Sequence, residues 1–593
     1  MPKSRFSIDI TDIIIFITIF ALAGLWINPV VYYSLPRYEA SGNPPAYPGQ
    51  GIEAAASFLI ASTFGNAWAG AFLFAAVLSA VCGLTGLLLR MQGGYARALG
   101  YPPAIIMLLH FVQPMHFLSD GLSIIAALAL MLLYQAIARL HAIARISLFL
   151  VFGSALFSCA PNGFIIFASL GIIFGIAGKR NFAAAAVQGV IAACIPVCAT
   201  ICFFPSYTIP QAYALVWKTV LPNSPFALLH LALLLYFPCS FALMHAMKGR
   251  PALLSVRKTV FQGAAIGATM AALAAIALWA ITTSDFHRNA GLQQAMLAEN
   301  WDRIIATGEK IPPASLTVVH THLIDRALYK KGRLLDDLFK FPQNQRALLF
   351  DIDDNKLSGW SYFWKHACVG WTYYDLGWVN GAENSACEAA TQGYRPAWLL
   401  LSRIYAAKGM PDAARICLGK LAQDPAYLHR AREILSALAT DSALSGMPDV
   451  RQVRSIMLKT DRLQSVESPL DLLIIENPGN RMAFEYRIAI QLLRGELDSI
   501  AAAVPKFRAL GYPRLPRLCE EALMLREMVM QKEPELYGYA LSRETIAAFK
   551  EFFSVLLTKH GGQAKNAYHD LAKYRGSYFF YCTYFMKPAG VNR

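Results

Sequence analysis

The sequence has 593 residues, of which 56% are hydrophobic and 15% are charged, and its mean hydropathy is +0.40. Soluble proteins average about 25% charged residues, so this composition excludes a wholly soluble enzyme, a secreted disulfide-rich protein and a disordered chain. Residues 1–283 hold 14 Lys/Arg and 5 Asp/Glu, whereas the remainder holds 39 and 33. We therefore expect a transmembrane domain over residues 1–284 and a water-soluble domain over residues 285–593.

The net charge of +15 does not indicate a nucleic-acid partner. The charges give +9 (14 − 5) in residues 1–283 and +6 (39 − 33) in the rest. Basic residues in the first part are of the kind that orient membrane helices, and the excess in the second part is spread over a long segment. The expected partner of the first domain is the lipid bilayer.

Apolar runs long enough to cross a bilayer occur about nine times before residue 285. A hydrocarbon core of about 30 Å needs about 20 apolar residues in a helix. The runs cover residues 10–33, 68–89, 103–117, 122–137, 146–159, 164–177, 182–204, 227–247 and 260–282. The third to sixth are short, so the count is good to about two.

The distribution of basic residues predicts the orientation of these spans. With the N-terminus inside, the inner loops carry twelve Lys/Arg, and the outer loops carry only Arg37 and Lys218. This asymmetry is typical of the positive-inside rule, and an odd number of spans then places residues 285–593 outside. We expect a bacterial inner-membrane protein whose C-terminal domain lies in the periplasm or on the outer side.

Only five acidic residues precede residue 284, and elimination favours Glu39 for chemistry. Asp9 and Asp12 lie at the inner face, where the first span begins, and Glu53 belongs to an amphipathic segment. Asp120 stands two residues before an apolar run, which is typical of an N-cap, with a catalytic carboxylate as the alternative. Glu39 lies just beyond the first span at the outer face, two residues from Arg37, and a surface pair with Arg37 is the alternative.

Polar side chains close to the third span are further candidates, because ionisable groups at membrane depth are rare. His110 and His116 flank Gln113-Pro114 at its outer end. One interpretation makes them hydrogen-bond partners at a kink, and the other makes them substrate-binding residues. Cys194, Cys198 and Cys202 form a helical stripe that favours packing between helices over metal binding.

Common catalytic and metal-binding motifs do not occur in the sequence. It has no CxxC, HExxH, P-loop or GxSxG motif, and the five cysteines after residue 284 are irregularly spaced. The sequence therefore predicts no metal site and identifies no cofactor.

The water-soluble part has the apolar period of α-helices and one clear repeat. Residues 398–425 follow the tetratricopeptide pattern with the set Trp398, Leu401, Ser402, Tyr405, Gly409, Ala414, Leu418, Leu421 and Pro425. Weaker copies flank it, and together they predict about five helix pairs in an α-solenoid. The expected fold is all-α, a polytopic transmembrane helix bundle followed by a tetratricopeptide-like solenoid that the aromatic segment 568–585 caps.

Aromatic residues are concentrated between residues 360 and 378. The tryptophans there are Trp360, Trp364, Trp371 and Trp378. Solenoid grooves bind extended peptides or glycans through such side chains, so these four are candidate contacts for a protein or glycan partner. Packing in the repeat core is the alternative.

Several ordered motifs carry a family resemblance. They are Pro36-Arg37-Tyr38-Glu39, the segment 47–51 (Tyr-Pro-Gly-Gln-Gly), the segments 477–480 and 483–486, and the aromatic C-terminus. The chain resembles an uncharacterised family of bacterial multi-pass envelope proteins with helical-repeat tails. In architecture it is also similar to GT-C O-mannosyltransferases with tetratricopeptide tails.

The second resemblance implies a membrane glycosyltransferase that takes sugar from a polyprenyl-phosphate donor at the outer face. Its acidic residue in the first outer loop would be Glu39 or, less well placed, Glu53. Asp120 would be a further carboxylate, and Arg37 and Lys218 would hold the lipid phosphate. The repeat domain would present a polypeptide acceptor. The alternative is a non-catalytic, membrane-anchored scaffold for an envelope assembly, and a transporter or flippase is a weaker third hypothesis.

Overall fold

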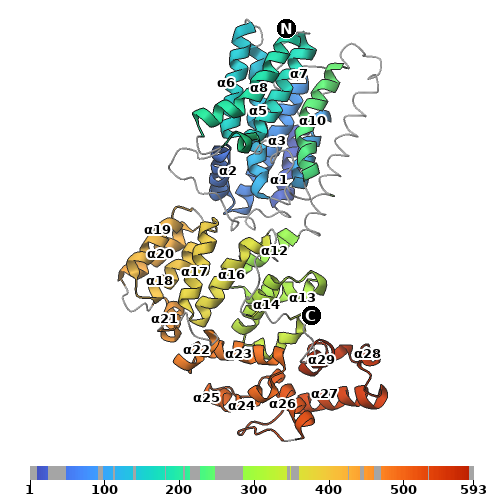
Figure 1. Ribbon diagram of the computed structural model, residues 1–593, viewed down its shortest axis with the longest axis vertical. Helices are drawn as coiled ribbons and strands as arrows, with labels where there is room; N and C mark the ends of the chain where they lie inside the picture. The colour runs from blue at the N-terminus through green and yellow to red at the C-terminus, as the bar shows by residue number, and fades with distance from the viewer. Residues whose placement is uncertain are drawn as a thin grey trace. The chain divides into compact units, whose positions relative to one another are not determined.

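The computed structural model describes most of the chain as helices. It covers residues 10–24, 48–90, 98–110, 114–137, 142–179, 182–204, 208–213, 227–246, 275, 285–343, 347–348, 360–424, 427–440, 446–459, 469–531 and 533–586. These residues form 27 α-helices and short 3₁₀ and π turns, and they contain no strand (Figure 1). The all-α prediction is thus confirmed for the described part of the chain.

The chain divides into two compact units, Met1–Ala290 with Asp424–Ala426, and Gly291–Gln423 with Tyr427–Arg593. The helices of the first unit are α1 (Ile10–Leu22), α2 (Gln50–Thr63), α3 (Ala67–Arg90), α4 (Pro102–His110), α5 (Pro114–Ile137), α6 (Ala142–Cys159), α7 (Pro161–Lys179), α8 (Phe182–Cys202) and α10 (Ala227–Ala246). Helix α12 (Asp285–Leu297) crosses the boundary between the units.

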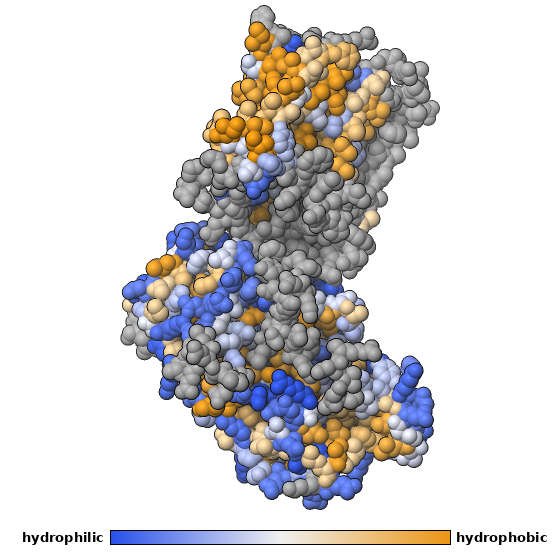
Figure 2. Space-filling view, in the orientation of Figure 1, coloured by the Kyte–Doolittle hydropathy of each residue, from blue (hydrophilic) through white to orange (hydrophobic). Residues whose placement is uncertain are grey.

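Apolar helices dominate the first unit. Ala67–Leu89, Leu118–Ile137 and Phe182–Cys202 are long and apolar enough to cross a bilayer, and Ile143–Cys159, Pro161–Ile176 and Leu231–Ala246 are shorter apolar helices. Large hydrophobic side chains also lie on the outer surface (Figure 2), where Ile143 is 79% exposed and Ile201 is 69% exposed. Such a surface is costly in water and favourable in lipid. The helices indicate a multi-pass membrane protein.

Glycines allow the helices of the first unit to approach closely. Helix α5 packs against both α3 and α7. A Cβ atom on Gly163 of α7 would lie 2.6 Å from the carbonyl oxygen of Ser123 on α5, and one on Gly171 would lie 2.6 Å from the Phe149 ring. Small residues at such crossings are typical of packed membrane helices, because they bring the backbones into contact.

The boundary between the third and fourth predicted spans differs from the sequence prediction. We expected a turn between residues 117 and 122, but α4 ends at His110 and α5 begins at Pro114. Proline disfavours a helical residue before it and fits the first position of a helix, so Pro114 starts α5. Helix α5 is continuous from Pro114 to Ile137, so the expected turn between residues 117 and 122 is absent.

The helices of the second unit form successive packed pairs. They are α13 (Trp301–Lys310), α14 (Val318–Lys330), α15 (Leu334–Asp337), α16 (Trp360–Leu376), α17 (Val379–Thr391), α18 (Pro396–Ala407), α19 (Pro411–Leu421), α20 (Leu428–Thr440), α21 (Pro448–Ile456), α22 (Pro469–Glu476), α23 (Arg481–Arg494), α24 (Leu497–Ala502), α25 (Val504–Ala509), α26 (Arg517–Met530), α27 (Arg543–Ser554), α28 (Ala564–Ala567) and α29 (Tyr578–Tyr584). Helix α16 packs on α17, α17 on α18, and α18 on α19. One continuous hydrophobic cluster extends from Leu292 to Phe580.

Glycines in the left-handed conformation end several of these helices. Gly377 follows α16 with φ +86°, and Gly409 lies between α18 and α19 with φ +77°. A residue with a side chain is strained at such angles, so glycine favours the sharp reversal between paired helices. The Gly377 turn is also crowded, because a Cβ atom there would lie 2.7 Å from the Ile456 carbonyl oxygen.

Candidate functional site

Several of the predicted site residues lie outside what the structure describes. Arg37, Glu39 and Lys218 fall in segments that are not described. His110 ends α4 and His116 lies in α5, but their side chains are not among those described, and the same holds for Trp360. Their roles therefore stay predictions.

Asp120 lies inside the membrane unit, in the first third of α5. The helix begins six residues earlier, at Pro114, so the N-cap interpretation of Asp120 is wrong. The Asp120 side chain is buried, and its Oδ1 accepts a hydrogen bond of 2.6 Å from Nδ2 of Asn162 on α7. A carboxylate in an apolar bundle needs such a donor, and a residue 42 positions away provides it.

The segment before α2 docks next to this polar pair. The Gly49 amide donates to the Ser158 carbonyl oxygen at 2.9 Å, and a Cβ atom on Gly49 would lie 3.1 Å from Pro161. Gly49 has φ +94°, so glycine suits both the backbone angle and the tight contact. The predicted outer loop that carries Glu39 therefore ends against the residue that precedes Asn162.

The tryptophans between residues 360 and 378 are mostly interior. Trp364 is 3% exposed and Trp371 is 8% exposed, whereas Trp378 is half-buried and packs against Tyr373 with 4.5 Å between ring centroids. Rings with so little exposure offer almost no surface to a glycan or a peptide. The burial of Trp364 and Trp371 favours the alternative that they pack in the core.

Trp371 instead belongs to a stack of cations and rings. The Arg326 guanidinium lies 4.9 Å from the Trp301 ring and 5.9 Å from the Trp371 ring, and the Arg403 guanidinium lies 5.2 Å from Trp371. Asp449 lies 3.2 Å from the Arg403 guanidinium. Cation–π contacts become stronger when water is excluded. This stack ties α13, α14, α16, α18 and α21 together.

Arg326 also forms an ion-pair group with Asp375. Arg326 Nη2 lies 2.7 Å from Asp375 Oδ2, and Lys330 Nζ lies 2.9 Å from Oδ1. Burial by itself raises the pKa of Asp375, but the charges of Arg326 and Lys330 hold that pKa below its usual value. The carboxylate is therefore ionised at neutral pH and compensates the buried Arg326 and the more exposed Lys330.

Helix α14 also buries two further titratable groups, His322 and Asp325. His322 hydrogen-bonds the Ala347 carbonyl oxygen at 2.7 Å and Thr372 Oγ1 at 2.9 Å, and burial lowers its pKa to about 4. Asp325 accepts from Gln343 Nε2 at 3.2 Å, and burial raises its pKa to about 8. Both side chains are therefore mainly neutral at pH 7, and both make hydrogen bonds in the interior of the second unit.

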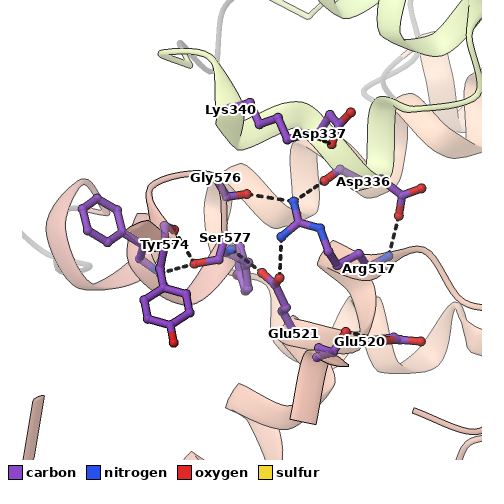
Figure 3. Close-up of polar contacts among 12 residues, drawn as sticks. Asp336, Asp337, Lys340, Arg517, Glu520, Glu521, Tyr574, Gly576 and Ser577 are labelled. Atoms are coloured by element: carbon purple, nitrogen blue, oxygen red, sulfur yellow. Dashed lines mark hydrogen bonds and ion pairs between the residues drawn. The ribbon is translucent and has the colours of Figure 1, made fainter. Parts of the chain in front are cut away.

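A third polar cluster joins three distant segments around Arg517 (Figure 3). Its Nη1 donates to Glu521 Oε1 at 2.7 Å, and its Nη2 donates to the Gly576 carbonyl oxygen at 3.0 Å and to the Asp336 carbonyl oxygen. The backbone amide of Arg517 donates to Asp336 Oδ1 at 2.6 Å. We call this cluster the Arg517 clasp, and it connects α15, α26 and the start of α29.

Two adjacent glutamates in the clasp each hold the N-terminus of another helix. Glu520 accepts from Thr545 Oγ1 at 2.7 Å and from the Ser542 amide at the start of α27. Glu521 accepts from the Tyr578 amide at the start of α29. Helix N-termini attract negative charge because their amides are unpaired. Burial raises the pKa of Glu521 to about 7, although Arg517 opposes that rise.

The sequence analysis did not predict the Arg517 clasp or the α14 cluster, by which we mean His322, Asp325 and Arg326 of α14 with Asp375, the partner of Arg326. Charged residues are expected at the surface by default, but the ion-pair partner of Arg326 lies 49 residues away and Arg517 hydrogen-bonds Asp336, 181 residues away. One available signal was the placement of Asp325-Arg326 within an otherwise apolar helical period. Another was the serine at position 542, which precedes an amphipathic run and is a typical N-cap residue.

Comparison with protein families identifies the family of the chain. The model of a family of unknown function (DUF6057) matches residues 45–585. No curated protein matches the chain. No solved structure matches it either.

Proposed function

The chain belongs to the DUF6057 family, and on that premise we propose that it is a membrane-anchored scaffold that displays a tetratricopeptide-like repeat domain outside the cytoplasm. In this proposal residues 1–284 cross the bacterial inner membrane about nine times, with the N-terminus inside. Residues 285–593 bind a protein or glycan partner of an envelope assembly. In this role the protein has no catalytic activity of its own.

The repeat register of α18 and α19 is the single observation that supports this function best. Ala414 and Leu418 are 0% exposed and Leu401 is 2% exposed, so the small and large motif positions face the helix contacts that the repeat pattern requires. The continuous cluster from Leu292 to Phe580 agrees with repeats that stack into one array. Arrays of this kind serve as binding surfaces in many proteins.

The topology part of the proposal rests on the order of helices and on charge. Helices α1, α3, α4, α5, α6, α7, α8 and α10 follow one another in the order of the first eight predicted spans. The ninth, residues 260–282, lies outside the described residues except for residue 275. Twelve inner-loop cations against two outer ones then favour an outward repeat domain.

A domain exchange tests the scaffold. Residues 1–284 are replaced by an unrelated single-span anchor that places residues 285–593 on the outer side, and the chimera is expressed in a deletion strain. A scaffold whose membrane part only anchors is expected to restore the phenotype, whereas the anchor alone is not. If the correctly exported chimera restores nothing, the membrane domain has an activity of its own and the proposal fails.

A glycosyltransferase of the GT-C type is the second candidate. One observation favours it: Gly49, ten residues after Glu39 in the sequence, contacts Ser158 and Pro161, and the next residue, Asn162, binds Asp120. Glu39 would then act on a polyprenyl-phosphate-linked sugar, with Arg37 and Lys218 at the phosphate.

The variant Glu39→Gln tests this second candidate, with Glu53→Gln as the matched control from the same loop. The enzyme hypothesis expects loss of complementation for Glu39→Gln at normal membrane abundance, and full function for Glu53→Gln. Full complementation by both variants would leave the scaffold as the better account.

A further inference from the structure

Polar side chains gather near one end of the helix bundle in the first unit. Helix α6 packs against α5, α7 and α8, and α7 packs against the same two partners (Figure 1). Tyr134 lies close to the end of α5, Arg145 in the first turn of α6, and Gln188 six residues after the start of α8. Six residues of α-helix are about 9 Å long, so these side chains lie near the depth of the lipid headgroups.

Tyr134 is fixed in an aromatic setting with its hydroxyl group oriented by Gln188. The tyrosine is 3% exposed, and its ring is edge-on to the rings of Phe149, Phe167 and Phe174, with 6.0 to 6.4 Å between centroids. Gln188 Nε2 donates a hydrogen bond of 2.5 Å to the Tyr134 hydroxyl oxygen. The hydroxyl proton of Tyr134 is therefore available for a further acceptor.

Gln188 brings a buried acceptor to the same place. Its side chain is 4% exposed, and its Oε1 forms no hydrogen bond with any described residue. Gly175 of α7 leaves space beside that oxygen, because a Cβ atom on Gly175 would lie 3.1 Å from it. A buried carbonyl oxygen is costly in free energy unless a donor reaches it, so this oxygen favours a ligand with a donor group.

Arg145 adds a cation to these two groups. It is half-buried, its Nε is buried and forms no hydrogen bond with a described residue, and its positive charge acts on the Tyr134 hydroxyl group. The surface at this end is apolar, because Ile143 is 79% exposed and Phe182 is 68% exposed. A cation beside a lipid-facing surface favours an anion, and phospholipid phosphates are the anions at this depth.

We propose that Arg145, Tyr134 and Gln188 bind the headgroup of a phospholipid in the leaflet that the basic loops predict to be cytoplasmic. The Arg145 guanidinium and the Tyr134 hydroxyl group donate to the phosphate. The Gln188 side-chain carbonyl accepts from a hydroxyl or ammonium group of the same headgroup. Phosphatidylglycerol has both features, whereas phosphatidylcholine has the phosphate without such a donor. This lipid site is separate from the partner binding that we assign to the repeat domain.

Native mass spectrometry of the full-length protein in detergent tests the site. Phosphatidylglycerol, phosphatidylcholine or inorganic phosphate is added at matched concentrations, and the bound fraction is measured. The wild type is expected to retain one phosphatidylglycerol molecule, with an affinity about tenfold greater than that for phosphatidylcholine. Equal affinity for the two lipids contradicts the proposal, and so does retention of inorganic phosphate without retention of lipid.

Three variants assign the binding to these side chains. Arg145→Gln is expected to lower the affinity for phosphatidylglycerol about tenfold. Arg432→Gln, at an exposed arginine on α20, makes the same change of charge and is expected to bind as the wild type does. Gln188→Leu removes the acceptor and is expected to lose the preference between the two lipids.

Wild-type affinity in Arg145→Gln would overturn the proposal, as would an equal loss in Arg432→Gln. A preference for phosphatidylglycerol that persists in Gln188→Leu contradicts the role of the Gln188 carbonyl. If Arg145→Gln does not accumulate, the comparison of the two lipids on the wild type decides, because the site requires that preference.

Discussion

Asp325 is the residue whose ionisation most clearly opposes folding of the second unit. It is fully buried and accepts one hydrogen bond from Gln343, while the nearby Arg326 is paired with Asp375. Its pKa is raised to about 8, so the free energy of unfolding that it contributes is greatest below pH 3.8 and is lost as the pH rises through 8. A neutral side chain of the same shape avoids this loss.

We therefore expect Asp325→Asn to stabilise the protein at pH 7.5 by on the order of 3 kcal/mol. The thermal midpoint of the full-length protein in detergent, followed by tryptophan fluorescence, measures the change. The gain is expected to shrink as the pH falls toward 4, where the wild-type carboxyl group is also neutral. Asp412→Asn, at an 89% exposed side chain, is the matched control and should change little. A variant that is less stable than wild type at pH 7.5 would show that Asp325 is ionised.

His322 has the opposite protonation behaviour on the same helix. Burial lowers its pKa to about 4, so the unfolded chain binds its proton first. Its contribution to stability is complete above pH 6.5 and is lost as the pH falls through 4. His322 and Asp325 are therefore both buried in their neutral forms at pH 7.

At the scale of elements, the contact between α18 and α19 tests the repeat register. Leu418 is 0% exposed, so Leu418→Ala is expected to cost about 2–5 kcal/mol. Ile416 lies two residues earlier on the same helix but is 69% exposed, and Ile416→Ala should cost less than about 1 kcal/mol. The difference between the two thermal midpoints checks the register. Equal midpoints would show that α19 packs through another face.

The turns between paired helices provide a second test at this scale. Gly377 and Gly409 share positive φ angles, but only Gly377 faces a close atom, the Ile456 carbonyl oxygen. Gly409→Ala is expected to cost about 1 kcal/mol from backbone strain, and Gly377→Ala clearly more, because α21 must also shift. A larger effect at Gly409 than at Gly377 would contradict the contact with α21.

Local patterns predicted the elements better than their contacts. The repeat motif placed Ala414, Leu418 and Leu421 correctly in the interior, because burial in paired helices follows directly from the apolar period. Asp120 was wrongly predicted to be an N-cap because that prediction uses only the neighbouring residues. Asp120 instead lies inside α5 and binds Asn162, 42 residues away. The α14 cluster and the Arg517 clasp depend on pairs up to 181 residues apart, which single-sequence periodicity does not encode.

For the whole molecule, the central claim is a multi-pass membrane domain with an outward repeat domain. The apolar helices of the first unit support the membrane domain. The distribution of basic residues among the loops supports the outward orientation of the repeat domain. In the outward orientation, the repeat domain meets its partner outside the cytoplasm. A reversed orientation would place that partner in the cytoplasm.

Paired reporter fusions after Arg593 and after Arg180 test this orientation most directly. An export-dependent enzyme and a cytoplasm-dependent fluorescent protein are each attached at both positions and read in intact cells. We predict that the export-dependent reporter is active after Arg593 and inactive after Arg180, and that the fluorescent protein gives the inverse pattern. Fluorescence after Arg593 together with export-dependent activity after Arg180 would contradict the account.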